Sequence, residues 1–288
     1  MSFSAIIHAM TYDGLDAMSL PAALQVLREA GFDGVMLMSI PGRPALTAQE
    51  TPEACLLDLA RSDLDVATSI ADEAGMRIVG LYGAGIDPTS EAAFDESVAH
   101  LRDACRAAEG LGCRHVGHSG GRAEAAGMTP DEKLEQIRRL ARIVDAAAAE
   151  FGDMLFAVDA HYHGVIESVA DCEHYLRELS SERAGILLNT GHMTTCEQPG
   201  WELLERHPAR VPVIGWKDHR PDPAGERPFL SVQLGTGDAP LQRYVAAARG
   251  QHADRVHVIN VEHVPMDRKR DALHHSLQHL QLLWERAR

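Results

Sequence analysis

The sequence repeats one pattern, in which an apolar helical segment ends in glycine and a short apolar run follows within a few residues. The pattern occurs around Gly31, Gly75, Gly112 and Gly152, for example as REAGFDGVMLM and DEAGMRIVGLY. A glycine directly after a helix can adopt the left-handed conformation that closes the last turn. The following runs are almost entirely apolar, which is typical of strands in a parallel sheet covered by helices. The repeat therefore predicts successive units of helix and parallel strand.

Eight apolar runs fit such strands, and eight helical segments alternate with them. The predicted strands are residues 4–9, 34–38, 77–82, 115–118, 154–159, 185–189, 213–216 and 256–262. The predicted helices are residues 20–30, 62–74, 94–111, 131–150, 169–179, 201–205, 240–248 and 268–286, with Ser62 and Ser90 as expected helix caps. Strict alternation of this kind favours an α/β fold of the closed (β/α)8 TIM barrel type.

A doubly wound open sheet is the alternative fold. No GxGxxG motif follows the first predicted strand, where a dinucleotide site would need it. The segments rich in proline and glycine, 41–44 and 220–228, are short, and we expect them to be loops after the second and seventh strands. Because no linker divides the chain, we predict a single domain that spans residues 1–288.

Polar residues gather at the carboxyl ends of the predicted strands, which form the active-site face of an α/β barrel. In chain order they are His8, Tyr82, His118, Asp159, His161, Asn189, His192, Lys217, Asp218, His219, Glu262 and His263. Carboxylates beside neutral imidazoles suit a divalent metal such as Mn, Co, Zn or Mg. They also suit proton transfer next to a carbonyl. We interpret the adjacent Lys217 and Asp218 as a structural ion pair rather than as a Schiff-base site.

The motifs at these strand ends resemble those of the xylose-isomerase-like sugar phosphate isomerase/epimerase superfamily, and the resemblance covers essentially the whole chain. They are DAH at 159–161, NTGH at 189–192, WKDH at 216–219 and EH at 262–263. The resemblance implies a TIM-type barrel with one divalent metal. The metal ligands are usually Glu after strand 5, Asp after strand 6, His or Gln after strand 7 and Glu after strand 8. This chain carries Asp159, Asn189, Gly215 and Glu262 there, with His219 near Gly215. The candidate metal ligands are therefore Asp159, Asn189, His219 and Glu262.

The resemblance also implies isomerisation or epimerisation of a small sugar, sugar phosphate or keto-polyol. The candidate catalytic residues are Asp159, Glu262 and His192. One carboxylate would remove a proton next to the carbonyl and the other would return it, while the metal or His192 stabilises the enediolate oxygen. The candidate substrate-binding residues are His161, Lys217, His118 and His8.

Three other functions stay open or are disfavoured. A lyase of the same fold, similar to inosose dehydratases or keto-glycoside-cleaving enzymes, matches the HYHG segment at 161–164 and would begin with the same proton removal. A non-catalytic relative would explain Asn189 and Gly215 as marks of a decayed metal site. A metallo-endonuclease is disfavoured because DNA binding needs a basic surface, whereas the net charge is -15.

The charge and the apolar pattern also restrict location and partners. We expect a small-molecule substrate and no nucleic acid. The five cysteines form no CxxC pair, which favours a reducing compartment. No basic segment followed by an apolar segment begins the chain, and no apolar run is long enough to span a membrane. We therefore expect a cytoplasmic protein without membrane contact, and relatives of this kind suggest a homodimer.

Overall fold

The fold is taken from a computed structural model, which describes residues 3–6, 15, 17–121, 128–249 and 254–287. The barrel strands are β1 (Ser4–Ile6), β2 (Gly34–Ser39), β3 (Arg77–Gly83), β4 (His115–Ser119), β5 (Leu155–Asp159), β6 (Ala184–Asn189), β7 (Val213–Trp216) and β10 (Val256–Ile259). The α-helices are α1 (Leu20–Glu29), α2 (Leu64–Glu73), α3 (Phe94–Gly110), α4 (Pro130–Ala148), α5 (Val169–Glu178), α6 (Thr190–Thr195), α7 (Trp201–Arg206), α8 (Leu241–Ala248) and α9 (Met266–Arg286). Short 3-10 helices are η1 (Leu59–Arg61) and η2 (Pro208–Arg210).

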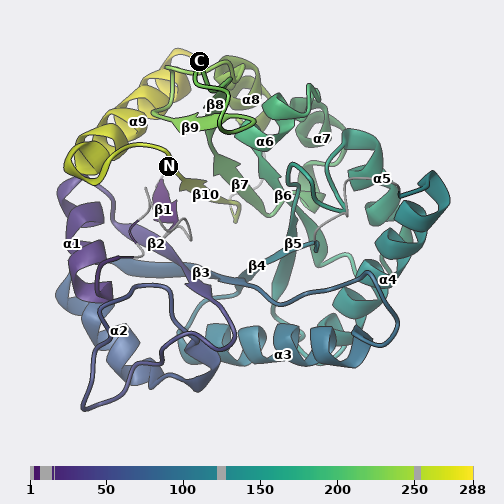
Figure 1. The fold of residues 1–288 in the computed structure, drawn as a ribbon, viewed down its shortest axis with the longest axis horizontal. Coiled ribbons are helices and arrows are strands. Elements are labelled where there is room, and N and C mark those ends of the chain that lie inside the picture. Colours follow the sequence, from purple (N-terminus) through teal and green to yellow (C-terminus); the bar gives the residue numbers. More distant parts are fainter. Residues whose placement is uncertain (1–2, 7–14, 16, 122–127, 250–253, 288) are drawn as a thin grey trace.

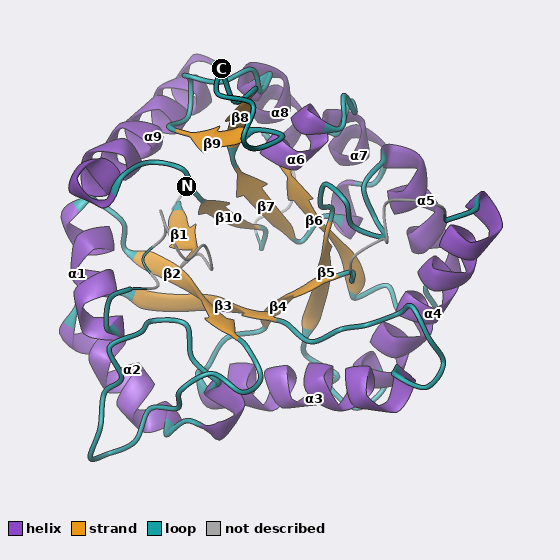
Figure 2. Cartoon of the chain, viewed as in Figure 1, coloured by secondary structure: helices purple, strands orange, loops and turns teal. Residues whose placement is uncertain are grey.

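The eight strands form a closed barrel in the order β1-β10-β7-β6-β5-β4-β3-β2, and every pairing is parallel. The longer helices lie outside the barrel as a surrounding ring (Figures 1 and 2). The first strand, β1, pairs with the last, β10, so the two ends of the sequence complete the barrel together. The predicted (β/α)8 fold is therefore confirmed. Among the described helices, none is both long and apolar enough to cross a membrane.

The barrel interior is packed beneath its carboxyl end. Met36, Ala157, Leu187, Val213 and Val258 come from five strands and form a buried cluster separate from the main core between strands and helices. Alternation along each strand places these side chains inside the barrel. On β4, the neighbouring position is Gly117, where a Cβ atom would lie 2.8 Å from Met36 Cε. Apolar side chains thus fill the barrel interior, and the polar side chains lie in the next layer toward the carboxyl end.

Two of the predicted helix caps differ from those observed. Helix α2 is capped by Asp63, whose carboxylate accepts from the backbone N–H groups of the first turn, whereas Ser62 accepts a hydrogen bond from the Leu46 N–H. Ser90 accepts from the Ala93 N–H, one residue before α3 begins. Both serines lie just before the helix, because Asp63 takes the N-cap position of α2 and Ala93 takes that of α3. By contrast, Thr129 and Ser168 form complete capping boxes at α4 and α5.

The segment predicted to be a loop after the seventh strand, residues 220–228, is a loop except for Arg220, and it connects the two strands of a β-hairpin that the sequence did not predict. Strands β8 (Asp218–Arg220) and β9 (Leu230–Val232) pair in antiparallel fashion and stand beside α9 (Figure 1). Strands of three residues are too short to show an alternating pattern, so the sequence did not reveal them. The final barrel strand also ends earlier than expected, at Ile259, because its last partner is the terminal residue of β7, Trp216. Residues 7–9 of the predicted first strand lie outside the described part of the chain.

Candidate active site

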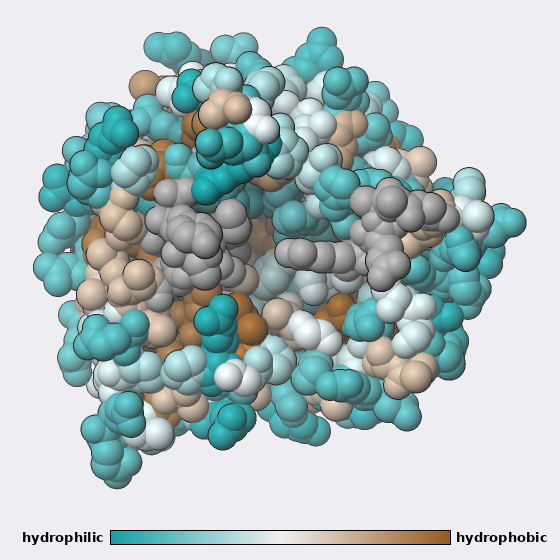
Figure 3. All heavy atoms as spheres, in the orientation of Figure 1, coloured by the Kyte–Doolittle hydropathy of each residue, from teal (hydrophilic) through white to brown (hydrophobic). Residues whose placement is uncertain are grey.

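A cavity of about 200 Å³ opens at the carboxyl end of the barrel, directly above the interior cluster. Its lining residues are Met38, Tyr82, Asp159, His161, Leu187, Asn189, Gly215, Lys217, Val258 and Asn260. A second cavity of about 660 Å³ shares Tyr82 and His161 and extends over the loops after β4 and β5. Figure 3 views the molecule from this end, where most of the visible rim is hydrophilic. The structure thus brings four of the predicted site residues to one small cavity, namely Asp159, His161, Asn189 and Lys217.

Asp159 ends β5 and is held by two donors. Only 8% of its surface is exposed. The Tyr82 hydroxyl donates to Oδ2 over 3.2 Å, and the Asn189 side-chain amide donates to Oδ1 over 3.3 Å. Burial, and then the charge of Asp159, raise the pKa of Tyr82 well above its usual value, so the phenol remains a donor. These contacts fix the orientation of the carboxylate on the cavity wall.

Asn189 joins two parts of the site. Its Oδ1 accepts from the His192 backbone N–H over 3.4 Å and so caps the short helix α6. Because this oxygen faces the helix, the amide NH2 group must face Asp159. The cap thus determines which group Asn189 offers to the cavity.

Lys217 follows β7 and is 3% exposed. Its ammonium forms an ion pair with Glu262 Oε1 and donates to His192 Nε2 over 3.3 Å. The Thr190 hydroxyl accepts from the Lys217 N–H over 2.9 Å and donates to the Lys217 carbonyl over 2.7 Å, which fixes the backbone. Lys217 therefore pairs with Glu262 rather than with its neighbour Asp218. The reason is that consecutive extended residues point their side chains to opposite sides.

Asp218 has a structural role on the other side of the strand. It is fully buried, and its carboxylate accepts from the backbone N–H groups of Gly235, Gly237 and Ala239 over 2.8 to 2.9 Å. Replacing Asp218 with Ala would leave these three backbone donors without their charged acceptor and would leave a void at a buried position. We expect the free energy of unfolding to fall by about 3–5 kcal/mol, measured by urea denaturation. Asp218→Asn, which keeps one acceptor oxygen, should cost clearly less, and equal losses for the two variants would contradict this role.

Glu262 lies in the segment after β10 and is 3% exposed. Its Oε1 also accepts from the Asn260 side-chain amide over 3.3 Å. The ammonium of Lys269, buried in α9, donates to the backbone carbonyls of Val261 and Glu262 over 3.0 and 2.6 Å. Helix α9 thus fixes the chain where Glu262 must meet Lys217. Glu262 stands behind Lys217 and is absent from the cavity lining.

Three imidazoles and a phenyl ring from the hairpin loop form a continuous aromatic group beside the ammonium. The rings of His161 and His192 lie 3.7 Å apart, and those of His219 and Phe229 are stacked at 4.0 Å. Burial, followed by the charge of Lys217, lowers the pKa of His192 well below its usual value and that of His219 to about 2. Both rings are therefore neutral at physiological pH.

The other predicted substrate-binding histidines are placed differently. His118 is buried on β4 and donates to the Ser119 carbonyl over 3.0 Å, and it lines neither of the two cavities. Burial lowers the pKa of His118 to about 4. His161 lines both cavities, as predicted for a residue that meets a ligand. His8 lies outside the described residues.

Four residues that shape this site received no role from the sequence. Tyr82 and Asn260 line the cavity, Thr190 clamps the backbone of Lys217, and Phe229 stacks on His219. Tyr82 was noted only as a polar residue at a strand end, and Thr190 only as part of the NTGH motif. Asn260 follows the last barrel strand, and its side-chain amide donates to Glu262 two residues later.

The donor set does not fit the divalent metal that the resemblance implies. Among the described residues, no three His, Cys, Asp or Glu side chains form a group that could hold a metal ion. The Asn189 oxygen is engaged in the α6 cap, and Gly215 offers no side-chain donor. The Lys217 ammonium pairs with the Glu262 carboxylate. His219 Nδ1 is hydrogen bonded to the Thr195 hydroxyl over 2.8 Å, so this ring could offer only Nε2. We therefore derive no chemical step through a metal.

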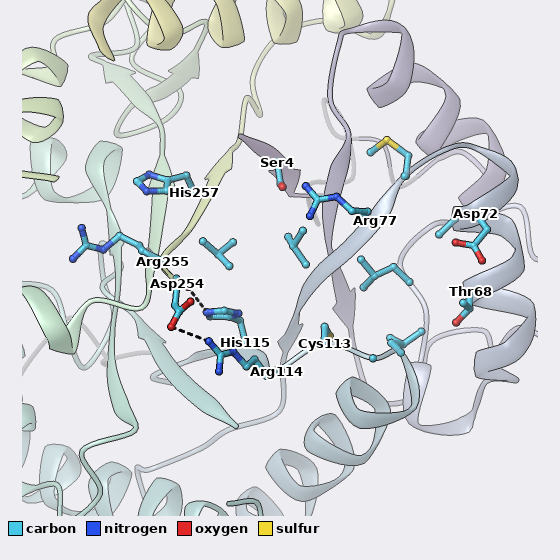
Figure 4. A pocket seen from close by; sticks show the side chains of 17 residues that line it. Ser4, Thr68, Asp72, Arg77, Cys113, Arg114, His115, Asp254, Arg255 and His257 are labelled. Carbon is cyan, nitrogen blue, oxygen red and sulfur yellow. Dashed lines mark hydrogen bonds and ion pairs between the residues drawn. The ribbon is translucent and has the colours of Figure 1, made fainter. Parts of the chain in front are cut away.

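A larger cavity, of about 760 Å³, lies at the opposite end of the barrel, among the amino ends of the strands (Figure 4). Asp254 pairs there with Arg114 at 3.1 Å, and its carbonyl is hydrogen bonded to His115 over 2.9 Å. The guanidinium of Arg255 is buried and donates to three backbone carbonyls. These contacts join the segments that close the barrel. Contacts at the amino end serve the stability of a TIM barrel, whereas chemistry occurs at the carboxyl end.

A closed barrel with convergent polar groups at its carboxyl end defines an enzyme-type TIM barrel. The sequence profile described as "xylose isomerase-like TIM barrel" matches residues 24–282, and the chain belongs to this family. Among curated protein sequences, none matches the chain.

Solved structures with the same fold include an epimerase, a protein with a bound zinc atom and a probable dehydratase. L-ribulose 3-epimerase is 15% identical, with a TM-score of 0.72 over 100% of this chain and 96% of that one. The IolI protein with a bound zinc atom is 14% identical, with a TM-score of 0.72 over 100% and 99% of the two chains. The probable 3-DHS dehydratase AsbF from Bacillus anthracis is 16% identical, with a TM-score of 0.70 over 98% and 99%. At these identities the similarity shows the fold.

Proposed function

We propose that this protein is an isomerase or epimerase that moves a proton next to the carbonyl of a small sugar, sugar phosphate or keto-polyol. The observation that carries the proposal is that a carboxylate and an ammonium, those of Asp159 and Lys217, line the same small cavity. Proton transfer next to a carbonyl needs a base for the carbon-bound proton and a cationic or hydrogen-bonding group for the oxygen. Epimerases of the same fold support this assignment.

In this proposal Asp159 is the base. Its carboxylate reaches the cavity, and Tyr82 and Asn189 hold it in one orientation. The Lys217 ammonium donates to the carbonyl oxygen, on which negative charge develops as the proton leaves. Neutral His192 keeps the ammonium in place through Nε2. Asn260 Oδ1, which is buried and has no partner among the described residues, accepts a hydrogen bond from a substrate hydroxyl.

Glu262 has a different role in this proposal from the catalytic role that its position after the last strand suggests. Because it stands behind Lys217, it balances the charge of the ammonium rather than meeting the substrate carbon. The proton can return from Asp159 itself or from another group that lines the cavity, such as His161. A bound divalent metal, a homodimer and a cytoplasmic location stay predictions from the sequence.

The Asp159→Asn variant tests the proposal. Wild-type protein is incubated with phosphorylated and unphosphorylated ketoses and keto-polyols, and proton NMR follows the appearance of an isomer of the same mass. We expect Asp159→Asn to slow this conversion at least about 100-fold, because the loss of a general base costs on that order. Tyr82→Phe, which removes one hydrogen bond to Asp159, should slow it by less than about 10-fold. Full activity in Asp159→Asn would remove Asp159 from the mechanism.

A lyase of the same fold is the second candidate. The cavity of about 660 Å³ lined by His161 and Tyr162 adjoins the smaller one and offers room for a leaving group. A dehydratase with this fold also supports it. In a lyase, removal of the same proton would be followed by loss of water or an aglycone, so mass spectrometry of the product separates the two reactions.

A further inference from the structure

The departures from the expected metal site change the balance of charge there, and the Lys217 ammonium restores this balance. The ligand pattern that the resemblance implies has three carboxylates around a cation of charge +2. Here Asn189 replaces one carboxylate and Gly215 removes the neutral ligand, so Asp159 and Glu262 remain. The ammonium of Lys217 lies against Glu262. The net charge of the centre is therefore -1 in both arrangements.

We propose that the Lys217 ammonium occupies the place of the divalent cation and that the site works with this tethered cation instead of a metal. The inference rests on the proposed proton transfer and names the group that stabilises its oxyanion. Lys217 is the only lysine or arginine among the described residues that line the cavity of about 200 Å³. The buried imidazoles of His192 and His219 cannot take its place, because burial and the charge of Lys217 lower their pKa values and keep them neutral.

The local contacts of the ammonium leave it one bond for a ligand. A lysine ammonium has three N–H donors. Within the described chain two acceptors meet it, Glu262 Oε1 and His192 Nε2. The third N–H group is therefore available to a carbonyl oxygen in the cavity. The Thr190 hydroxyl holds the backbone on both sides of the residue, so the charge is pre-positioned rather than carried on a mobile arm.

The chemical step balances without any added cofactor. Asp159 takes the proton from the carbon next to the carbonyl, and the electron pair of the C–H bond forms the new C=C bond. The carbonyl π electrons move to oxygen, where the Lys217 N–H group stabilises the charge. Return of a proton to either face of the same carbon reverses these changes and regenerates the carbonyl group. In an isomerisation the proton instead adds to the former carbonyl carbon, the neighbouring hydroxyl becomes the new carbonyl, and its proton passes to the enolate oxygen. The ammonium gives up no proton and forms no covalent bond to carbon.

The Lys217→Met variant and its metal affinity test the inference without relying on activity. Purified protein is freed of metal with a chelator and titrated with Mn²⁺ or Zn²⁺ by calorimetry. We expect wild-type protein to show no stoichiometric binding. In Lys217→Met, Glu262 and His192 lose their cation, and we expect divalent affinity to rise at least about 10-fold. Stoichiometric binding to wild type, or no gain in the variant, would overturn the inference.

The activity measurements separate this inference from the proposed function. Chelator-treated wild-type protein should keep full conversion of its ketose substrate, and Lys217→Met should lose at least about 100-fold, the cost of removing one oxyanion donor. In Lys217→Ala, added ethylammonium should restore part of the lost rate. Wild-type activity that a chelator abolishes and Mn²⁺ or Zn²⁺ restores would overturn the inference while the proposed function stands. No conversion under any condition would contradict the proposed function, and the titration would still decide the inference.

A covalent role for Lys217 is a distinct outcome of the same preparation. Borohydride is added to the protein with substrate, and the intact mass is measured. We expect no adduct. A reduced adduct mapped to Lys217 would show that the lysine forms an imine with the carbonyl carbon, and it would overturn the non-covalent role.

Discussion

Replacing Lys217 with Met is expected to lower the free energy of unfolding by about 3–5 kcal/mol, because it leaves the buried carboxylate of Glu262 without its cation. Glu262→Gln should cost a similar amount for the opposite reason, since it strands a buried ammonium. Replacing both residues together should cost far less than the sum, because neither charge is then left unpaired. Urea denaturation of the four proteins measures the coupling.

An exposed ion pair supplies the control for this cycle. Arg106 and Asp103 pair on the outer face of α3 at 2.7 Å, with side chains 62% and 47% exposed. Arg106→Met should change the free energy of unfolding by less than about 0.5 kcal/mol, because water screens such pairs. If the losses from Lys217→Met and Glu262→Gln simply add, the two side chains do not form the buried pair described here.

The second large effect is expected from pH. Burial lowers the pKa of His115 and His118 to about 4, of His257 to about 3 and of His219 to about 2. Burial also keeps the pKa of His192 well below its usual value. In the unfolded chain these groups take up protons below a pH of about 6.5, whereas in the folded protein they stay neutral to much lower pH. Acid therefore favours unfolding.

The expected slope can be stated and measured. Above pH 7 both states are neutral at these histidines, so stability should vary little. Between pH 6.5 and 5, each of the buried histidines is expected to lower the free energy of unfolding by up to about 1.4 kcal/mol per pH unit. Urea denaturation over this range measures the total change in the free energy of unfolding with pH. His118→Gln should reduce this change by the contribution of one histidine. A slope that is flat in the wild type would contradict the buried neutral imidazoles.

The fold could be predicted because its signal is local and repeated. Four of the eight apolar runs follow a glycine just after a helix, and buried parallel strands tolerate few polar residues. Each of the eight predicted strands therefore overlaps an observed one. The antiparallel hairpin was missed because three residues are too few to show a period. The cap of α2 was misplaced by one residue because Ser62 and Asp63 are both suitable N-cap types.

The candidate site could be predicted only in its residue types. The strand ends identified Asp159, Asn189, Lys217 and Glu262, because the carboxyl ends of parallel strands converge on one face. Their partners depend on side-chain direction across the barrel, which the sequence does not record. Lys217 meets a residue 45 positions later rather than its neighbour, and that contact decides whether the site holds an ammonium or a metal.

Incorporation of deuterium from D2O into a substrate carbon next to the carbonyl tests the central claim most directly. Chelator-treated wild-type protein and Asp159→Asn are incubated with the same ketose until the wild-type reaction reaches equilibrium, and NMR locates the deuterium. The account predicts deuterium at the carbon next to the carbonyl with the wild type and at least about 100-fold slower incorporation with Asp159→Asn. Conversion of substrate without any deuterium, or undiminished incorporation by Asp159→Asn, would contradict it.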